Sequence, residues 1–272
     1  MVSQWERLLK NSGTWIGSFT RLSPNGEQIS DTPTEIALKP QGDSMRQEIR
    51  KLPPGEAPQE TVLEYRSLGK GVLFCEDGAF SQGSIQWSPF GAFGAELGFI
   101  HGTERLRLVE LFKGERTLSS LTLIREHLEG TQPQLRPPVS IDQLIGTWKG
   151  KAVTVYPDFQ PEETYVTQLE IRREGCDRIH QTLQFGQSPP MQTVGTLLEN
   201  KVQFDQGAQP VTVLLLPSGA SATYPTHIES GKPLFLEAGW LITPTLRQRL
   251  IRTYNAQGTW VSLTLVAEQK TL

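Results

Sequence analysis

The sequence predicts an all-β protein built from two tandem antiparallel β-barrels, each opened by a short helix. Three observations lead to this prediction. The motif Gly-Thr-Trp-x-Gly occurs twice, at residues 13–17 and 146–150. Each copy starts a series of short alternating segments separated by turn residues, which is typical of an antiparallel barrel or sandwich. A closed barrel is the favoured alternative because it leaves no free edge strand. The 25 glycines and 19 prolines also favour many turns over long helices.

The first unit is expected to span residues 1–131. Ser3 and Glu6 have the spacing of a capping box, so a short apolar helical turn is predicted before Gly13. Trp15 then lies on the first extended run, where side chains alternate between two faces. Further strands are predicted at residues 34–38, 45–52, 61–67, 71–75, 105–112 and 118–126.

Prolines concentrate in residues 132–138, and this density predicts an extended linker rather than a strand. The second unit, residues 139–272, restarts the pattern, because Ser140 and Gln143 repeat the capping-box spacing. The ends match as well, since Ser-Leu-Thr-Leu at 120–123 returns at 262–265. Two copies of this length indicate duplicated domains rather than a solenoid. The strands of the second unit are predicted at residues 148–156, 164–172, 180–185, 191–198, 201–204, 211–216, 223–230 and 233–241.

The composition argues against several classes of function. The net charge is -3 and neither half is basic, which argues against a nucleic-acid partner. Cys75 and Cys176 are the only cysteines, too few for a disulfide framework or a zinc site. No stretch reaches the ~18 apolar residues of a membrane span, and no signal peptide is visible. We therefore expect a cytoplasmic protein with no nucleic-acid partner, no membrane span, no cofactor and no metal.

Charged and aromatic residues supply the candidate binding positions. Arg105 and Arg107 recur 142 residues later as Arg247 and Arg249. Such arginines can pair with neighbouring glutamates or bind an anionic ligand inside a barrel. The glycine-rich aromatic segment 77–102 can pack in the core or form a protein-contact surface. The candidate ligand or interaction residues are Trp87, Phe90, Phe93, Glu237, Trp240, Arg247, Arg249 and Arg252.

Catalytic motifs are not evident: the chain has no Ser-His-Asp order, nucleophile elbow, phosphate loop or dinucleotide fingerprint. Glu96 and Glu237 occupy equivalent places before an aromatic residue, but they belong to different units and are not expected to share a site. We therefore predict no catalytic residues and a protein that is not an enzyme.

A short helix leading into Gly-x-Trp on a first strand resembles the start of the calycin barrels, which include lipocalins and fatty-acid-binding proteins. In that group the tryptophan closes one end of the barrel, and a basic residue near the last strand commonly packs on it. The resemblance implies closing roles for Trp15 and Trp148, with Arg125 against Trp15. The position that matches Arg125 in the second unit is Ala267. That unit is expected to close differently, or to use Arg247, Arg249 or Arg252.

The whole chain resembles a narrower family of paired calycin barrels from cyanobacteria and plastids, known as a domain of unknown function. The resemblance rests on the double Gly-Thr-Trp start, on residues 237–242, and on residues 247–254 followed by Gly-Thr-Trp at 258–260. A plastid member of that family helps to assemble the F1 head of ATP synthase through contacts with its subunits.

The resemblance implies a non-catalytic assembly factor whose partners are ATP synthase F1 subunits. The alternative is a carrier of a small apolar ligand, such as a lipid, carotenoid or bilin, because small barrels can enclose one ligand. An isomerase or cyclase acting inside a barrel is a third hypothesis. One barrel fold hosts many functions, so the fold alone does not choose among them.

Overall fold

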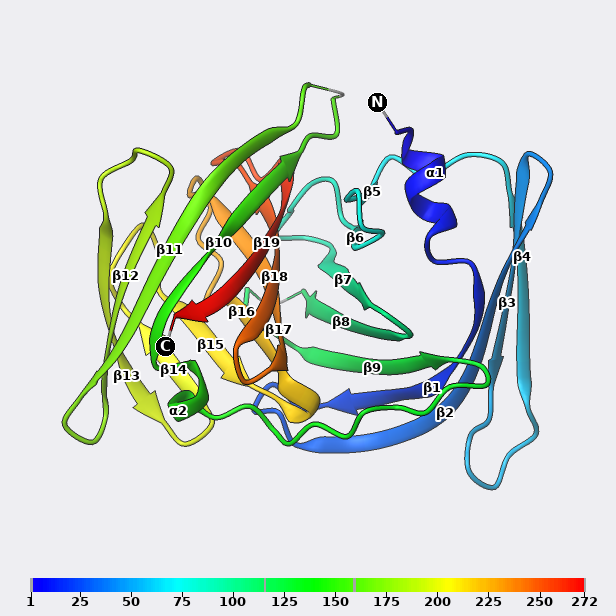
Figure 1. Cartoon of the computed structure of the whole chain (residues 1–272), viewed down its shortest axis with the longest axis horizontal. Helices are drawn as coiled ribbons and strands as arrows, with labels where there is room; N and C mark the ends of the chain where they lie inside the picture. Colours follow the sequence, from blue (N-terminus) through cyan, green and yellow to red (C-terminus); the bar gives the residue numbers. More distant parts are fainter. Residues whose placement is uncertain (1, 115, 159, 272) are drawn as a thin grey trace.

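A computed structural model describes residues 2–114, 116–158 and 160–271 of the chain. Nearly all of its regular structure is antiparallel β-sheet, arranged as two barrel-like units side by side (Figure 1). The predicted fold class, two tandem β-barrels that each follow a short helix, is confirmed. The longest helix in the described residues has six residues, and none is long and apolar enough to cross a membrane.

The first unit is a curled antiparallel sheet of nine strands within the described residues, in the order β4-β3-β2-β1-β9-β8-β7-β6-β5. The two edge strands, β4 and β5, are not hydrogen-bonded to each other within the described residues, so the sheet forms an open barrel. The elements of this unit are α1 (Gln4–Leu9), β1 (Gly13–Leu22), β2 (Gln28–Gln41), β3 (Ser44–Lys51), β4 (Gln59–Tyr65), β5 (Val72–Phe74), β6 (Phe80–Gly83), β7 (Ala92–His101), β8 (Glu104–Lys113) and β9 (Ser120–Leu128).

The second unit is a closed barrel, in which β10 pairs with both β11 and β19. Closure removes free sheet edges. The elements of this unit are α2 (Ile141–Leu144), β10 (Gly146–Val155), β11 (Glu163–Glu174), β12 (Arg178–Phe185), β13 (Met191–Leu198), β14 (Lys201–Phe204), β15 (Val211–Leu215), η1 (Pro217–Gly219), β16 (Ala220–Pro225), β17 (Leu234–Thr243), β18 (Leu246–Tyr254) and β19 (Trp260–Thr271).

Both glycines of the repeated motif have a geometric role. Gly13 and Gly146 each adopt φ 127°, a backbone conformation that side chains disfavour. Gly17 and Gly150 lie against the last strand of their units, where an added Cβ would be 1.9 Å from Arg125 O and 2.2 Å from the Ala267 carbonyl oxygen, respectively. The motif therefore provides a turn and then a close approach between the first and last strands.

The two units pack through equivalent strands. β7 contacts β17 and β18, and β8 contacts β17, so the same part of each duplicate faces the other. Phe99 and Trp240, which match each other in the two copies, meet with ring centroids 6.1 Å apart. The helices α1 and α2 correspondingly lie at opposite ends of the molecule (Figure 1). This arrangement resembles the isologous interface of a dimer, in which the same patch is used twice.

The segment predicted as a linker crosses between the units in extended form. Arg136 bonds to the first unit through Glu104, at 2.9 and 2.6 Å, and to the second through the carbonyl oxygen of Ile242 at 2.8 Å. Its guanidinium also lies 5.2 Å from the ring centroid of Trp240. The linker is thus fastened to both units, while the exact domain limits remain a prediction.

Two charged residues at equivalent positions, Glu110 and Arg252, are fully buried between the units. Arg252 is well bonded: it donates to the Tyr254 hydroxyl at 2.8 Å and to the Ser84 carbonyl oxygen at 3.0 Å. Neither carboxyl oxygen of Glu110 has a hydrogen-bond partner among the described residues. Burial, with a contribution from Glu237, raises the pKa of Glu110 well above its ordinary value. Glu110 therefore opposes folding wherever its unfolded form is ionised.

Replacing Glu110 with methionine should stabilise the protein. Removing an unpaired buried carboxyl should raise the free energy of unfolding by about 1–3 kcal/mol at pH 7. Because the folded pKa is raised, the wild type should lose stability as pH rises above about 4.5. The variant should lack that loss. Urea unfolding between pH 5 and pH 8 measures both effects, with exposed Glu129→Met as the control. A Glu110→Met protein less stable than wild type at pH 7 would contradict this account.

Candidate functional site

The repeated tryptophans, Trp15 and Trp148, are buried at the start of the first strand of each unit, and their role in closing the barrel remains a prediction. The indole N–H of Trp15 donates to Asn11 O at 2.9 Å, and that of Trp148 donates to Leu144 O at 2.8 Å. Both bonds reach four residues back, to the end of the helical segment before the strand. An arginine stacks on each ring: Arg105 lies 4.4 Å from the centroid of Trp15, and Arg247 lies 4.8 Å from that of Trp148.

The arginine that covers Trp15 is therefore Arg105 and not the predicted Arg125. Side chains alternate along β9, and the positions that line the first cavity are even-numbered, such as Ile124. Arg125 consequently points outward, where it donates to the Thr20 hydroxyl at 2.7 Å. The repeat could have indicated this arginine. Arg105 is the counterpart of Arg247, which the sequence suggested as a closing residue of the second unit.

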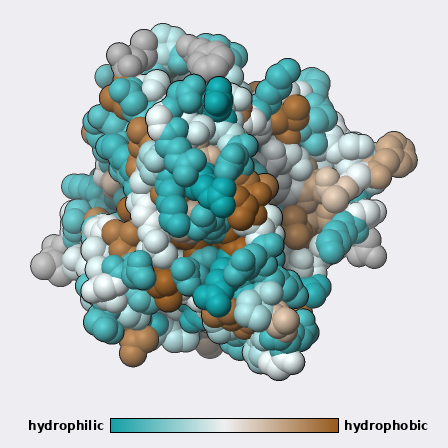
Figure 2. Space-filling view, turned by 90° about the vertical axis from the view of Figure 1, so that its right-hand side faces the viewer, coloured by the Kyte–Doolittle hydropathy of each residue, from teal (hydrophilic) through white to brown (hydrophobic). Residues whose placement is uncertain are grey.

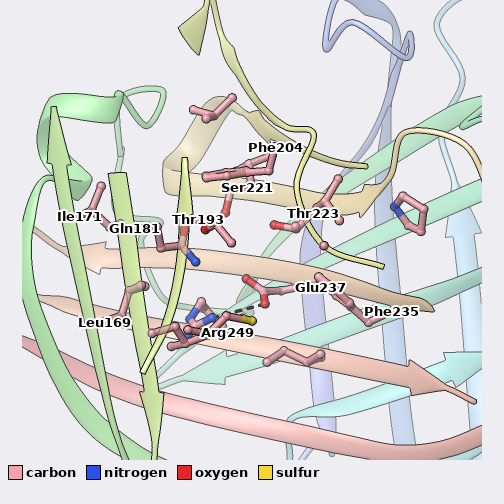
Figure 3. A pocket seen from close by; sticks show the side chains of 18 of the residues that line it. Leu169, Ile171, Gln181, Thr193, Phe204, Ser221, Thr223, Phe235, Glu237 and Arg249 are labelled. Atoms are coloured by element: carbon pink, nitrogen blue, oxygen red, sulfur yellow. Dashed lines mark hydrogen bonds and ion pairs between the residues drawn. The ribbon is translucent and has the colours of Figure 1, made fainter. Parts of the chain in front are cut away.

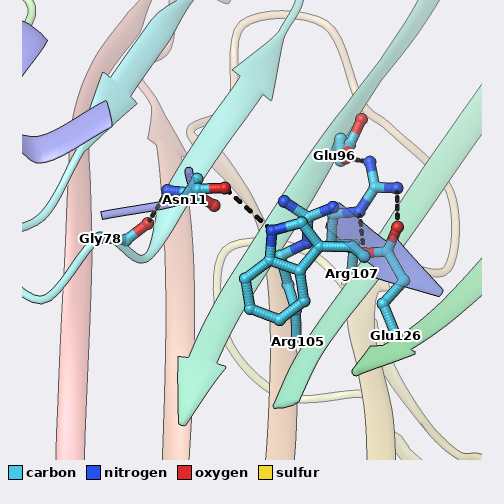
Figure 4. Close-up of polar contacts among 7 residues, drawn as sticks. Asn11, Gly78, Glu96, Arg105, Arg107 and Glu126 are labelled. Atoms are coloured by element: carbon cyan, nitrogen blue, oxygen red, sulfur yellow. Dashed lines mark hydrogen bonds and ion pairs between the residues drawn. The ribbon is translucent and has the colours of Figure 1, made fainter. Parts of the chain in front are cut away.

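A compact charged cluster of Arg105, Arg107, Glu96 and Glu126 lies inside the first unit (Figure 4), and its Arg105 covers the ring of Trp15. Arg105 Nε donates to Glu126 Oε2 at 2.6 Å. Arg107 donates through Nε and Nη2 to the two oxygens of Glu126, at 3.0 and 2.9 Å, and through Nη1 to Glu96 at 2.6 Å. Burial works against ionisation of Glu126, but Arg107 and Arg105 outweigh it and lower its pKa to about 2. All three guanidinium nitrogens of Arg107 and both oxygens of Glu126 thus have partners within the cluster.

The second unit contains the equivalent cluster, but it is looser. Arg247 Nε and Arg249 Nε both donate to Glu268 Oε1, at 2.5 and 3.1 Å. The contact from Arg249 Nη1 to Glu237 lengthens to 3.4 Å. Arg249 Nη2 and Glu268 Oε2 are buried without a hydrogen-bond partner in the described chain. Burial raises the pKa of Glu237 despite the nearby guanidinium of Arg249.

The looser cluster lines a cavity of about 460 Å³ inside the closed barrel (Figure 3). This volume is within the range of small-molecule sites, about 300–1,000 Å³. The lining is mainly aliphatic and aromatic, and Ser221 and Thr223 add hydroxyl groups. Representative apolar lining residues are Leu169, Ile171, Leu183, Phe204, Phe235 and Ile251.

The first unit has a cavity of about 400 Å³, and Arg105, Arg107 and Glu96 are part of its lining. Leu63 from the edge strand β4 and Phe74 from β5 also line it, so the cavity lies beside the gap between the two edge strands. Among the described residues, no three His, Cys, Asp or Glu side chains are grouped so that they could hold a metal ion.

The structure separates the sequence-based candidates into three places. Glu237, Arg247 and Arg249 meet at the cavity of the closed barrel. The candidates buried between the units are Phe93, Trp240 and Arg252. Trp87 bonds to the second unit through its backbone N–H, 2.8 Å from Gly258 O, whereas Phe90 is 95% exposed. Their proposed binding roles remain predictions.

Sequence reasoning missed the hydroxyl groups in the second cavity. Ser221 and Thr223 alternate on β16, and both point into the space that also contains Glu237 and Arg249 (Figure 3). The segment 220–225 has the period-2 pattern of a strand. However, only the closed barrel shows that the face with Ser221 and Thr223 is internal.

Both halves of the chain match known family models. Residues 1–131 match the N-terminal model of a domain of unknown function, DUF3598. Residues 135–271 match the model described as "Biogenesis factor required for ATP synthase 1, C-terminal domain". No curated protein matches the chain.

Solved structures provide further comparisons. A protein of unknown function from the DUF3598 family of Nostoc punctiforme is 46% identical, with a TM-score of 0.94 and 100% of both chains covered. An S-type phycobiliprotein lyase from Guillardia theta is 15% identical, with a TM-score of 0.40, over 48% of this chain and 90% of the lyase. Kievitone hydratase from Nectria haematococca is 10% identical, with a TM-score of 0.24, over 100% of this chain and 93% of the hydratase.

Replacing Glu126 with glutamine should destabilise the first unit by about 3–5 kcal/mol at pH 7, because Arg105 and Arg107 lose their shared buried carboxylate. The folded pKa of Glu126 is lowered from 4.5 to about 2, so its contribution is present above about pH 4.5 and is lost as pH falls toward 2. The stability difference between wild type and variant should shrink over that window. Urea titrations at pH 7, 4 and 2.5 measure it, with exposed Glu76→Gln as the control. A difference that stays constant down to pH 2.5 would refute this role for Glu126.

Proposed function

Because this chain belongs to the DUF3598 family, we propose that it is a non-catalytic assembly factor for the F1 head of ATP synthase, acting in the cytoplasm. The observation that carries the proposal is the match of residues 135–271 to the C-terminal model of a biogenesis factor required for ATP synthase. The proposed partners are F1 subunits, in keeping with the family resemblance of the sequence.

The edge strand β4 is the contact site that best suits such a partner. Outside its ladder with β3, no backbone group of β4 is hydrogen-bonded in the part of the chain that the structure describes. About half of the N–H and C=O groups of an antiparallel edge strand point away from its neighbour. Val62 and Leu63 on β4 are 48% and 46% exposed. An exposed edge of this kind can accept an extended segment of another protein.

The opposite edge of the sheet is protected, which makes β4 distinctive. The Gln4 side chain on α1 bonds to both the N–H and the C=O of Phe74 on β5, at 2.7 and 2.9 Å. On the other side of the gap between β4 and β5, Trp5 of α1 packs edge-to-face on Tyr65 of β4, with ring centroids 6.2 Å apart. The helix thus covers β5 and the end of β4 and leaves most of β4 free. On this side of the molecule, hydrophobic surface is visible between hydrophilic side chains (Figure 2).

Tagged protein purified gently from the organism that encodes it should bring down F1 subunits, identified by mass spectrometry. Leu63→Lys should reduce their recovery at least tenfold, because a charged side chain disfavours strand addition at an edge. Ile29→Lys, at a residue 58% exposed on β2, is the matched control. Unchanged melting temperatures would show that both variants remain folded.

The outcomes separate the function from the contact site. Normal recovery with Leu63→Lys would exclude β4 as the site while leaving the assembly function intact. A deletion strain that accumulates normal amounts of assembled ATP synthase would overturn the assembly function itself.

A second candidate function is that of a carrier for a small apolar ligand in the closed barrel. The observation that favours it is the cavity of about 460 Å³ with its mainly apolar lining. The proposed ligand classes are lipid, carotenoid and bilin. Such a cavity suits one molecule, because it lies inside a β-barrel and its lining is mainly apolar.

The carrier function predicts a bound molecule in protein purified from its natural source. Native mass spectrometry should detect one added mass per chain, and organic extraction should release it. Filling the cavity with Leu183→Trp should abolish the added mass, whereas Leu63→Lys should not affect it. Protein that consistently carries no small molecule, and that takes up none from a total lipid extract, would rule this function out.

A further inference from the structure

The exposed side of the edge strand β4 carries charges in an ordered pattern. Glu60, Val62 and Glu64 alternate along the strand with Leu63 and its neighbours, so they lie on the face opposite to the cavity of the first unit. Glu60 and Glu64 are four residues apart, which corresponds to about 13 Å along an extended strand. The free edge of the sheet therefore presents two carboxylates on its outer face, with one apolar side chain between them.

The charges on this outer face alternate in sign from strand to strand. Glu35 of β2 stands opposite Arg50 of β3, and Arg50 stands opposite Glu60 of β4. The Arg50 guanidinium lies 3.8 Å from the carboxylate of Glu35 and 3.5 Å from that of Glu60. Opposite charges on neighbouring strands stabilise a sheet, and like charges directly opposite each other destabilise it. A strand added beside β4 would continue the series with a basic residue opposite Glu60.

The row that contains Glu64 leads to the same requirement. Arg46 of β3 stands opposite Glu64 and donates to it at 2.5 Å. Within the described residues, the ion pairs of Glu60 and Glu64 all run to β3, and their side chains remain 70% and 60% exposed. A carboxylate has two oxygens and can accept from several donors. The side of both carboxylates that faces away from β3 is thus open to a second cation.

The inner face of β4 requires apolar partners instead. Thr61 stands opposite Ile49 of β3, and Ile49 and Leu63 both line the cavity of the first unit. Side chains that an added strand turned inward would pack beside Leu63 at the rim of this cavity. Trp5 of α1 already packs on Tyr65, so the open part of the strand is residues 59–64.

The same charges disfavour a second copy of this chain as the occupant. Two β4 strands paired antiparallel and centred on Val62 would place each Glu60 opposite Glu64 of the second copy. Such a pairing puts like charges directly opposite each other at two positions, which is destabilising. Charged residues on an edge strand commonly prevent self-association in this way. The occupant that fits β4 is therefore a segment of a different protein.

We propose that β4 takes up an extended segment of a partner protein that has basic residues at its first and fifth positions and apolar residues at its second and fourth. The basic side chains pair with Glu60 and Glu64, and the apolar side chains pack beside Thr61 and Leu63. This pattern reads the same in both directions, so it applies to a parallel and to an antiparallel strand. The inference rests on β4 as the contact site of the proposed assembly function and specifies the chemistry of the partner segment.

Fluorescence anisotropy of labelled peptides with the full chain tests the inference. The three peptides contain Lys-Val-Thr-Val-Lys, Glu-Val-Thr-Val-Glu or the rearranged Lys-Lys-Thr-Val-Val, between identical Gly-Ser flanks. The wild type should bind the first peptide at least tenfold more tightly than either of the others, because only that peptide places a cation opposite each carboxylate and both valines inward. The rearranged peptide controls for attraction of any basic peptide to a chain of net charge -3.

Variants of the two carboxylates supply a second readout. Glu60→Gln combined with Glu64→Gln should reduce the preference for the basic over the acidic peptide to less than threefold. Glu163→Gln combined with Glu174→Gln, at exposed positions of β11, is the matched control and should keep the wild-type preference. Glu60→Lys combined with Glu64→Lys should reverse the preference in favour of the acidic peptide. An unfolded protein would not gain such a preference.

The outcomes separate this inference from the assembly function. Equal binding of the basic and acidic peptides, equal binding of the rearranged peptide, or no binding of any peptide would overturn the inference, while recovery of F1 subunits still tests the assembly function. A wild-type dimer that becomes monomeric with Leu63→Lys in analytical ultracentrifugation would overturn it by assigning β4 to a second copy. A tenfold preference for the basic peptide without recovery of F1 subunits would support the segment chemistry and contradict the proposed partner.

Discussion

The apolar outer faces of β7, β8, β17 and β18 constrain the whole molecule, because each unit can bury this face only against the other. Phe93 meets Tyr254 with ring centroids 5.0 Å apart, and Phe112 meets Tyr224 at 6.4 Å. Residues of both units form one continuous hydrophobic cluster across this interface. The two halves are therefore coupled in stability, even though each has its own sheet. Glu110, whose buried carboxyl oxygens have no hydrogen-bond partner among the described residues, opposes that stability.

The apolar interface between the units also accounts for the polar residues inside the two barrels. A strand alternates its side chains between two faces, so strands that face the other unit with leucine and phenylalanine turn their remaining positions inward. On β8 and β18 those inward positions include the arginines, Arg105 and Arg107 in the first unit and Arg247 and Arg249 in the second. Each barrel thus contains charges that must be paired, and the glutamates of β7, β9, β17 and β19 provide the carboxylates. Trp15 and Trp148 each lie under one of these arginines.

Duplication left the two copies different in ways that suit different tasks. The first sheet remains open at β4, and its charged cluster is internally satisfied. The second sheet is closed, and in its cluster the Nη2 atom of Arg249 is buried without a hydrogen-bond partner among the described residues. An exposed edge suits contact with a protein, whereas an enclosed cavity suits a small molecule. The proposed protein-contact strand and the cavity of the closed barrel therefore lie in different halves of the chain, so the two proposed functions are compatible with one another.

Much of this fold follows from the sequence alone. The repeat, the capped helical turns, the all-β class and most strands could be inferred from local patterns, because turn chemistry and period-2 alternation are properties of neighbouring residues. The strands β6 and β7 were missed, since the glycines and aromatics of residues 77–102 obscure the alternation. Only the tertiary structure decided which face of each strand is internal. Leu121 and Leu123 face the other unit rather than a barrel interior, which is why Arg125 points outward and Arg105 covers Trp15. Whether a face is inside depends on what packs over it, and that contact joins residues more than a hundred positions apart.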